Sequence, residues 1–376
     1  METNNITTNK NVGLYVHIPF CKSKCPYCDF YSFTPGEPAV DRYTEAAAAS
    51  IGVWQSLMGL TFDTVYFGGG TPSFIGAERL AKLAGAALAG QPKGILREFT
   101  VECNPGAVHG GFFDMMARCG VNRISLGLQS AADGERKALG RLSDAETALE
   151  KIREAQCAGI SNISFDLMLG VPGQTADSLK RSIDFCAESG ATHVSAYILK
   201  LEERTPFYKN QRELNLPDEG EVCGLYTLAC EALEQAGFAQ YEVSNFARPG
   251  YESLHNLKYW NAEEYLGIGP SAHSFLGGRR FCCPRDIEYF LAAKPIIDDG
   301  AGGGFEEYAM LRLRLTDGLT ERGVRERFGH RIPGSMRKSA ERFQESGHLV
   351  SDRGGIRLTR AGFLLSNYVI GELLGT

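Results

Sequence analysis

The sequence predicts an α/β protein: a partial (β/α)6 barrel of the TIM type, followed by a smaller C-terminal domain. Short apolar runs typical of strands alternate with helical periodicity from residue 12 to about residue 245. Beyond the glycine-rich segment 300–304 the pattern changes to helices around a single hairpin. We therefore expect four regions: a disordered tail (1–11), the barrel (12–245), an irregular linking region (246–304) and a winged-helix-like α+β domain (305–376).

The barrel is predicted from six apolar runs rich in β-branched and aromatic residues. These runs cover 12–18, 63–69, 98–104, 122–129, 163–170 and 192–199. Two of the intervening stretches, 41–59 and 145–159, show clear helical periodicity, and Gly159 is a plausible helix stop. Strands separated by helices are expected to run parallel, with the helices as crossover connections.

Polar or glycine-rich features recur where the predicted strands end. The first strand runs into a cysteine-rich loop, and the second runs into "GGGTPS" (68–73). Glu102, Gln129 and Asp166 lie at or near the ends of the next three strands. Barrels of this type place their chemistry at the carboxyl ends of the strands, so we expect these features to converge on one face.

The C-terminal region predicts two helices within residues 306–329, then a helix, a hairpin that turns at 353–355, and a final helix. Winged helices can bind DNA, but residues 305–376 hold twelve Lys and Arg against nine Asp and Glu, a net charge of +3. This small excess is not clustered as a stripe. We expect an accessory packing role and no nucleic acid partner.

The composition is that of a globular protein with a sizeable core, with 376 residues, 43% hydrophobic residues and a net charge of −6. The mild acidity gives no electrostatic reason to expect nucleic acid or an anionic membrane as the main partner. No apolar run approaches the ~18 residues of a membrane span, and the polar N-terminus lacks the apolar core of a secretory signal. Eleven cysteines in such a chain indicate a reducing compartment, and hence a cytoplasmic protein.

Three of these cysteines, Cys21, Cys25 and Cys28, fall within eight positions in the pattern C-x3-C-x2-C. Structural zinc sites usually have four ligands, so a zinc site here would need a distant Cys or His to complete it. A 4Fe-4S cluster held by three thiolates keeps one iron open for a substrate or cofactor. The cluster is the favoured interpretation, and the completed zinc site remains the alternative.

This loop at the end of a first strand, "CKSKCPYC", resembles the radical S-adenosylmethionine (SAM) superfamily. The resemblance implies that SAM chelates the open iron and that the reduced cluster cleaves it to a 5′-deoxyadenosyl radical. It also implies a set of SAM-contacting positions, because "GGGTPS", "VECNP" and "LGLQS" match further segments of the superfamily. These positions are Tyr15, Tyr27, Gly69, Gly70, Thr71, Glu102, Gln129, Arg141 and Asp166.

Nearly the whole chain resembles the coproporphyrinogen oxidase family, the HemN/HemW group. Oxygen-independent coproporphyrinogen III oxidases of this family carry another cysteine two positions past the third, where this chain has Phe30. The HemW-type haem chaperones have phenylalanine there, together with an H-N-x-x-Y-W motif, which is "HNLKYW" (255–260) here. The resemblance therefore implies a haem chaperone that delivers haem to acceptor haemoproteins. Radical oxidative decarboxylation of coproporphyrinogen propionates is the alternative.

The "HNLKYW" segment suits a haem site. His255 offers an imidazole as an axial iron ligand, and Tyr259 and Trp260 offer flat faces for a porphyrin. Asn256 could orient the histidine or bond a propionate. The resemblance further implies respiratory membrane enzymes as acceptors, peripheral association with the inner membrane, and a homodimer. The vicinal pair Cys282–Cys283 receives no role.

Overall fold

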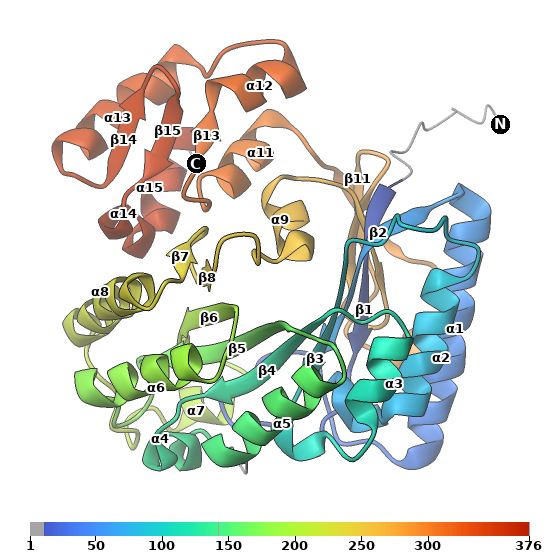
Figure 1. Cartoon of the computed structure of the whole chain (residues 1–376). Coiled ribbons are helices and arrows are strands. Elements are labelled where there is room, and N and C mark those ends of the chain that lie inside the picture. The colour runs from blue at the N-terminus through green and yellow to red at the C-terminus, as the bar shows by residue number, and fades with distance from the viewer. Residues whose placement is uncertain (1–10, 142, 376) are drawn as a thin grey trace.

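The computed structural model describes residues 11–141 and 143–375. Its largest element is a curved sheet of twelve strands (Figure 1), in the order β12-β11-β10-β9-β1-β2-β3-β4-β5-β6-β8-β7. Six of these strands follow one another in chain order and run parallel. They are β1 (Asn11–Ile18), β2 (Thr61–Gly69), β3 (Glu98–Cys103), β4 (Arg123–Gln129), β5 (Asn162–Leu169) and β6 (His193–Ile198).

The crossover helices lie along the outer, convex side of this sheet (Figure 1). They are α1 (Glu37–Met58), α2 (Ala77–Leu88), α3 (Phe112–Arg118), α4 (Asp133–Ala138), α5 (Ala145–Cys157) and α6 (Ala176–Glu188). After β6 come the short helix α7 (Pro206–Lys209), which lies against the cysteine loop, and the longer helix α8 (Glu219–Gln235). Two 3-10 turns, η1 (Pro72–Ile75) and η2 (Pro105–Ala107), follow β2 and β3. The chain leaves α5 through Gly159, whose φ of +91° suits glycine, as predicted. The predicted partial (β/α)6 barrel is confirmed.

The barrel does not close, because β1 pairs with β9 rather than with β6. The prediction that 246–304 is an irregular linking region was wrong. This segment holds β9 (Tyr265–Ile268), β10 (His273–Leu276), β11 (Arg279–Cys282), β12 (Ile297–Ala301), α9 (Leu254–Trp260) and α10 (Ile287–Leu291). Its strands are only four or five residues long, and they form by pairing with β1 and with each other. At the opposite end, β7 (Ala239–Gln240) and β8 (Asn245–Ala247) extend the sheet beyond β6.

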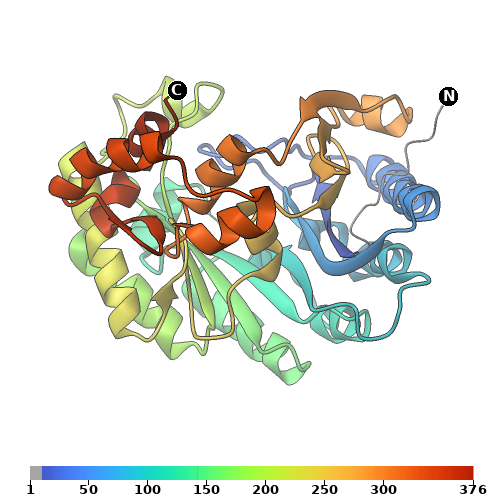
Figure 2. The ribbon, with the colours of Figure 1, turned by 90° about the horizontal axis from the view of Figure 1, so that it is seen from above.

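The C-terminal region forms the predicted small α+β domain. It contains α11 (Phe305–Arg312), β13 (Leu319–Thr320), α12 (Glu321–Phe328), α13 (Gly334–Glu345), β14 (Leu349–Asp352), β15 (Gly355–Leu358), α14 (Arg360–Leu364) and α15 (Ser366–Leu374). The hairpin β14–β15 turns where the sequence predicted. The domain joins the barrel through backbone bonds from Val243 N–H to Arg314 O (3.0 Å) and from Thr316 N–H to Tyr241 O (3.1 Å). Figure 2 shows it over the green and yellow half of the molecule.

The core is built mainly by the parallel strands. Leu14, Val16, Phe67 and Phe165 are among the side chains with no solvent exposure. The strand register places these four side chains on one face of the sheet, whereas the opposite face carries polar residues such as Glu102, Ser125 and Asp166. Of the predicted tail, residues 1–10 lie outside the described residues, and Asn11 already belongs to β1. No helix among the described residues is long and apolar enough to cross a membrane.

Candidate functional site

A cavity of about 690 Å³ opens at the carboxyl ends of the parallel strands. It is lined by the cysteine loop and by residues from the ends of several strands, which confirms that these features converge on one face. Twelve of the predicted site residues line it: Cys21, Cys25, Tyr27, Cys28, Gly69, Gly70, Thr71, Glu102, Gln129, Arg141, Asp166 and Asn256. The other four, Tyr15, His255, Tyr259 and Trp260, lie outside this lining.

The three cysteines of the loop are partly exposed, and each faces the cavity. Two side chains from other elements donate to their sulfurs. The Thr71 hydroxyl lies 3.4 Å from Cys21 Sγ, and Arg141 Nη1 lies 3.7 Å from Cys25 Sγ. Burial raises the pKa of the Cys28 thiol. The hydroxyl and the guanidinium both point at sulfurs of the loop, so these contacts suit a metal-binding loop.

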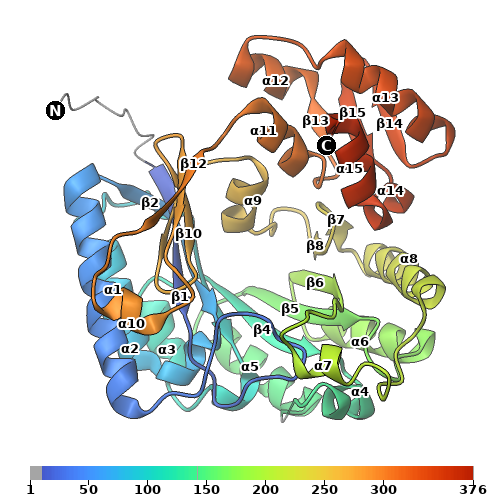
Figure 3. The ribbon, with the colours of Figure 1, turned by 180° about the vertical axis from the view of Figure 1, so that it is seen from behind.

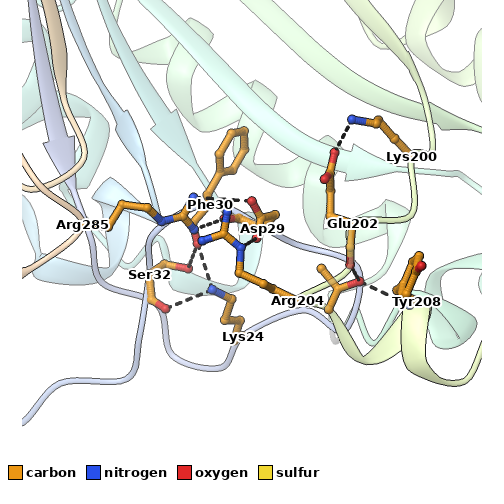
Figure 4. A network of polar contacts seen from close by, with 10 residues as sticks. Lys24, Asp29, Phe30, Ser32, Lys200, Glu202, Arg204, Tyr208 and Arg285 are labelled. Carbon is orange, nitrogen blue, oxygen red and sulfur yellow. Dashed lines mark hydrogen bonds and ion pairs between the residues drawn. The ribbon is translucent and has the colours of Figure 1, made fainter. Parts of the chain in front are cut away.

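The outer part of the loop is held from two sides (Figure 4). Arg285 donates to the Asp29 carbonyl oxygen (2.5 Å) and lies 3.4 Å from its carboxylate, and Arg204 lies 3.6 Å from the other carboxylate oxygen. Lys24 donates to the Phe30 carbonyl oxygen (2.8 Å). The Phe30 residue itself is 67% exposed and borders the cavity. The backbone is therefore fixed at the position where the related oxidases carry a further cysteine, while the side chain is open to solvent.

Gly69 and Gly70 of the "GGGTPS" segment pack too closely on β1 and on the residues after it to be replaced by any larger residue. A Cβ on Gly69 would lie 2.6 Å from the His17 ring, and one on Gly70 would lie 2.7 Å from the Phe20 carbonyl oxygen. The N–H groups of Gly70 and Thr71 donate to β1 and to the residues after it, at 2.8 Å each. These two N–H groups are therefore engaged within the protein, and the SAM contact implied for Gly69, Gly70 and Thr71 stays a prediction. The tight turn serves strand packing and aims the Thr71 hydroxyl at the cysteine loop.

Two carboxylates lie together in the cavity. Glu102 accepts hydrogen bonds from the Tyr66 hydroxyl (2.8 Å) and from Gly69 N–H (3.1 Å). Asp166 accepts one from the Ser125 hydroxyl (3.2 Å). Burial, and then the charge of Asp166, raises the pKa of Glu102 to about 7, and burial also raises the pKa of Asp166. A pair of buried acceptors with raised pKa values suits a ligand that carries hydroxyl or ammonium donors.

Arg141 bridges the cysteine loop and the end of β4. Besides its contact with Cys25, it donates to the Gly127 carbonyl oxygen (2.5 Å). A Cβ on Gly127 would lie 2.6 Å from Arg141 Nη2, so any larger residue here would displace the guanidinium. Gln129, two residues on, has a φ of +68°, a conformation that is uncommon outside glycine. The strand thus ends in a strained turn beside a guanidinium, and a guanidinium is well suited to a ligand carboxylate.

The two predicted tyrosines take different places. Tyr27 lies in the cysteine loop and lines the cavity, and its ring packs edge-on against Phe207. Tyr15 lies behind the cavity, with its hydroxyl 2.9 Å from His17 Nδ1 and its ring tilted against Tyr66. Burial raises the pKa of both phenols. Tyr15 therefore supports Tyr66, and through it Glu102, instead of reaching the cavity itself.

His255 does not offer an open imidazole, contrary to the sequence-based expectation. The residue has no solvent exposure, and both ring nitrogens are engaged: Nδ1 lies 2.9 Å from the Thr64 hydroxyl and Nε2 lies 2.8 Å from the Tyr259 hydroxyl. Its ring stacks on Tyr66 at 5.3 Å. Burial, and then the charge of Lys258, lowers the pKa of His255 to about 3, so the imidazole is neutral. In this conformation no ring nitrogen is free for an iron.

The remaining predicted residues of the "HNLKYW" segment all belong to the helix α9, but they lie in different surroundings. Asn256 borders the cavity, whereas Tyr259 packs edge-on against Tyr265 and Trp260 is half-buried. The helix is fixed by Glu98 of β3, whose carboxylate accepts from the N–H groups of Leu254 (2.7 Å) and His255 (3.1 Å). The motif therefore meets the cavity through Asn256 alone among its predicted residues.

Several residues that line the cavity were missed from the sequence, among them Tyr66, Arg123, Ser125, Ser195 and Tyr197. Arg123 is only 2% exposed, and its Nε has no hydrogen-bond partner within the described part of the chain. One signal was available, because an arginine that opens an apolar strand run must either reach solvent or pair inside. The serines and tyrosines gave no such signal, because the apolar runs do not show which face of each strand turns inward.

Comparison with known proteins gives consistent results for both regions. The Radical SAM superfamily pattern matches residues 15–186, and the HemN C-terminal domain pattern matches residues 305–365. "Heme chaperone HemW" of Bacillus subtilis is 34% identical over 96% of this chain and 98% of its own length. The protein of the same name from Lactococcus lactis is 35% identical over 96% of each chain.

Among solved structures, coproporphyrinogen III oxidase (HemN) from Escherichia coli superposes with a TM-score of 0.83. The match covers 97% of this chain and 90% of that one, at 20% sequence identity. At this level of identity the likeness supports the fold and does not extend to the reaction. It includes the C-terminal domain as well as the barrel.

Proposed function

Because the chain belongs to the HemW family of radical SAM proteins, we propose that it is a haem chaperone, which binds haem and delivers it to acceptor haemoproteins. The observation that carries the proposal is the three-cysteine loop at the mouth of the cavity, with an exposed Phe30 in place of a fourth thiol. The related oxidases carry that fourth thiol. Respiratory membrane enzymes as acceptors, peripheral association with the inner membrane, and a homodimer belong to the same proposal.

Membership of the radical SAM superfamily implies a 4Fe-4S cluster and SAM. We assign three irons of the cluster to Cys21, Cys25 and Cys28, whose sulfurs face the cavity beside a hydroxyl and a guanidinium donor. When bound, the cluster and SAM supply one-electron chemistry. The chain contributes orientation and charge, because Thr71 and Arg141 fix two of the sulfurs in place.

The cavity residues fit SAM by their donor and acceptor types. Glu102 and Asp166 are buried acceptors for ribose hydroxyls and the ammonium group, and Arg141 is the donor for the carboxylate. Gly69 and Gly70 keep the wall of the cavity close to the loop. Tyr27 and Gln129 border the same space, and Tyr15 acts from behind by holding Tyr66.

For haem, we propose the face that carries α9, with Asn256, Tyr259 and Trp260 as contacts and His255 as the axial ligand. Since both nitrogens of His255 are engaged, ligation requires the hydrogen bond to Tyr259 to open first. In Tyr259→Phe the competing hydroxyl is gone, so haem affinity should be equal or higher. In His255→Phe, which keeps the ring packing, haem affinity should fall about tenfold or more.

Haem titrations followed by absorbance test this pair of variants. Equal haem affinity in wild type and His255→Phe would remove the ligand assignment and leave His255 as a support for Tyr66. The function is tested in parallel, with the cluster reconstituted anaerobically. We expect stable haem binding, and no protoporphyrinogen by mass spectrometry when coproporphyrinogen, SAM and a reductant are added. Efficient decarboxylation would favour the oxidase and reject the chaperone.

A further inference from the structure

The outer edge of the main sheet lies away from the cavity. It consists of the short antiparallel strands β10, β11 and β12, which lie beside α1 and α10 (Figure 3). The last strand, β12, buries little: four of its five residues are exposed, and Ile297 is 45% exposed. Hydrophobic burial therefore contributes little to holding this edge strand, which is held by its pairing with β11 and by the ion pair between Arg279 and Asp298.

Three side chains with metal-binding chemistry meet on this edge. His273 and Cys282 are directly opposite each other in the β10–β11 pair. Asp299 lies on β12 at a register shift, where Arg280 pairs with Gly300 and Phe281 pairs with Asp298. The shift leaves Asp299 as the extra residue of a bulge.

The potential ligand atoms of His273, Cys282 and Asp299 all lie within 4.8 Å of one another. The imidazole Nδ1 of His273 is 3.6 Å from a carboxylate oxygen of Asp299. All three residues are partly or fully exposed, so a cation can reach them from solvent. None of the three belongs to the residues that line the large cavity.

We propose that His273, Cys282 and Asp299 bind a divalent transition cation of the zinc type. A nitrogen, a thiolate sulfur and a carboxylate oxygen are ligands that zinc accepts together, in a four-coordinate geometry. The hard cations magnesium and calcium take oxygen ligands, which this site supplies from a single side chain. Three protein ligands leave a fourth position open to solvent. The bound cation would join all three edge strands, and it acts independently of the haem function proposed above.

The neighbouring residues provide matched controls. Cys283 follows Cys282 directly, and successive side chains in an extended segment point to opposite sides. Cys283 lies on the side of Tyr43, a buried residue of α1, and burial raises the pKa of the Cys283 thiol to about 11. Asp298 precedes Asp299 and is held in an ion pair with Arg279. The cysteine ligand and the aspartate ligand therefore each have a neighbour of the same residue type, Cys283 or Asp298, that is not proposed to bind the cation.

The test uses the full-length protein with its iron–sulfur cluster reconstituted anaerobically and excess metal removed. Zinc is titrated in competition with a chromophoric chelator. We expect one zinc ion per chain, with affinity reduced about tenfold or more in Cys282→Ser, His273→Gln and Asp299→Asn. Cys283→Ser and Asp298→Asn should bind as the wild type does. Hydrogen exchange in β12 should slow when zinc is added to the wild type, and not in Asp299→Asn.

X-ray absorption at the zinc edge defines the ligand set. The expected shell has one sulfur at about 2.3 Å and the rest nitrogen or oxygen. A shell with two or more sulfurs, or an equal loss of zinc affinity in Cys283→Ser, would mean that the vicinal pair Cys282–Cys283 binds the zinc. Either result would overturn the proposal. It is equally overturned by no stoichiometric binding, or by binding that none of the three substitutions weakens, as expected for zinc held by the cysteine loop.

Discussion

The cysteine loop and the helix α9 are both candidate binding segments in the sequence, yet they differ in whether their potential ligand atoms are accessible. The sulfurs of the loop face a cavity of about 690 Å³ and are only partly buried. In α9, His255 has no exposure and makes two side-chain hydrogen bonds, and the backbone at its start is bonded to Glu98. One segment presents its reactive atoms, and the other has its polar groups satisfied inside the protein.

Because of this difference, the two segments have different roles in the conformation described. The loop can take a ligand without rearrangement, because its sulfurs already face open space. In α9, His255 contacts the cavity wall from behind: its ring stacks on Tyr66, and the Tyr66 hydroxyl donates to Glu102. The helix therefore acts first as a support for the cavity, and any direct contact with haem through His255 requires local opening.

The largest expected effect comes from the open segment. Cys25→Ser should abolish assembly of the 4Fe-4S cluster, because two thiolates cannot hold three irons. Iron and sulfide analysis after anaerobic reconstitution measures this directly. Cys157→Ser, at an exposed thiol at the end of α5, is the matched control and should retain four irons per chain. Four irons per chain in Cys25→Ser would contradict the assignment of the cysteine loop as the segment that binds the cluster.

The second effect concerns the closed segment. Glu98→Ala removes a buried acceptor from the start of α9 and also the nearby negative charge that stabilises buried Arg123. We expect the free energy of unfolding to fall by about 3–5 kcal/mol, as when one partner of a buried charged pair is lost. Glu263→Ala removes a half-exposed partner of Lys258 and should cost about 1 kcal/mol or less.

Equilibrium urea unfolding of the cluster-free protein compares these two variants. Similar losses for Glu98→Ala and Glu263→Ala would mean that α9 is not fixed by its buried contacts. The description of α9 as a support for the cavity would then fail. An unchanged slope of the unfolding transition is needed for the comparison, since the slope reports the surface exposed on unfolding.

The smallest effect links the two segments through Glu102. Its pKa is raised from 4.5 to about 7, so the folded protein binds a proton that the unfolded chain has lost. The free energy of unfolding should therefore fall as the pH rises from 4.5 to about 7, by up to about 1.4 kcal/mol per pH unit. Glu102→Gln should lack this contribution. SAM affinity in the wild type should rise through about pH 7, as the carboxylate forms, and stay flat in Glu102→Gln.

Isothermal titration of SAM at several pH values checks this dependence. A rise that persists in Glu102→Gln would assign the titration to another group, with Asp166 as the nearest candidate, since its pKa is also raised.

Much of the fold could be predicted, because the six parallel strands are buried along most of their length and show as apolar runs between helical segments. The convergence of the cysteine loop, Glu102 and Asp166 followed from the rule for strand ends. The strands β9–β12 could not be predicted in the same way. They are short, and they depend on pairing: β9 pairs with β1, a strand about 250 residues away in the chain, and β10, β11 and β12 add to it in turn.

The role of His255 was beyond the sequence for a related reason. Its partners Thr64, Tyr66 and Glu98 lie on strands more than 150 residues earlier, so no local pattern shows that the ring is buried. Local sequence patterns therefore identify residues able to bind a ligand, but the fold decides which of these residues are accessible to one.

Haem transfer tests the central claim most directly. The cluster-loaded protein is saturated with haem, separated from free haem, and mixed with an excess of an apo-haemoprotein, and the haem spectrum of each protein is recorded after separation. Our account predicts that haem binds saturably and then moves to the acceptor faster than from a non-specific carrier such as serum albumin. Absence of saturable binding, or haem that remains on the protein while the acceptor stays empty, would contradict it.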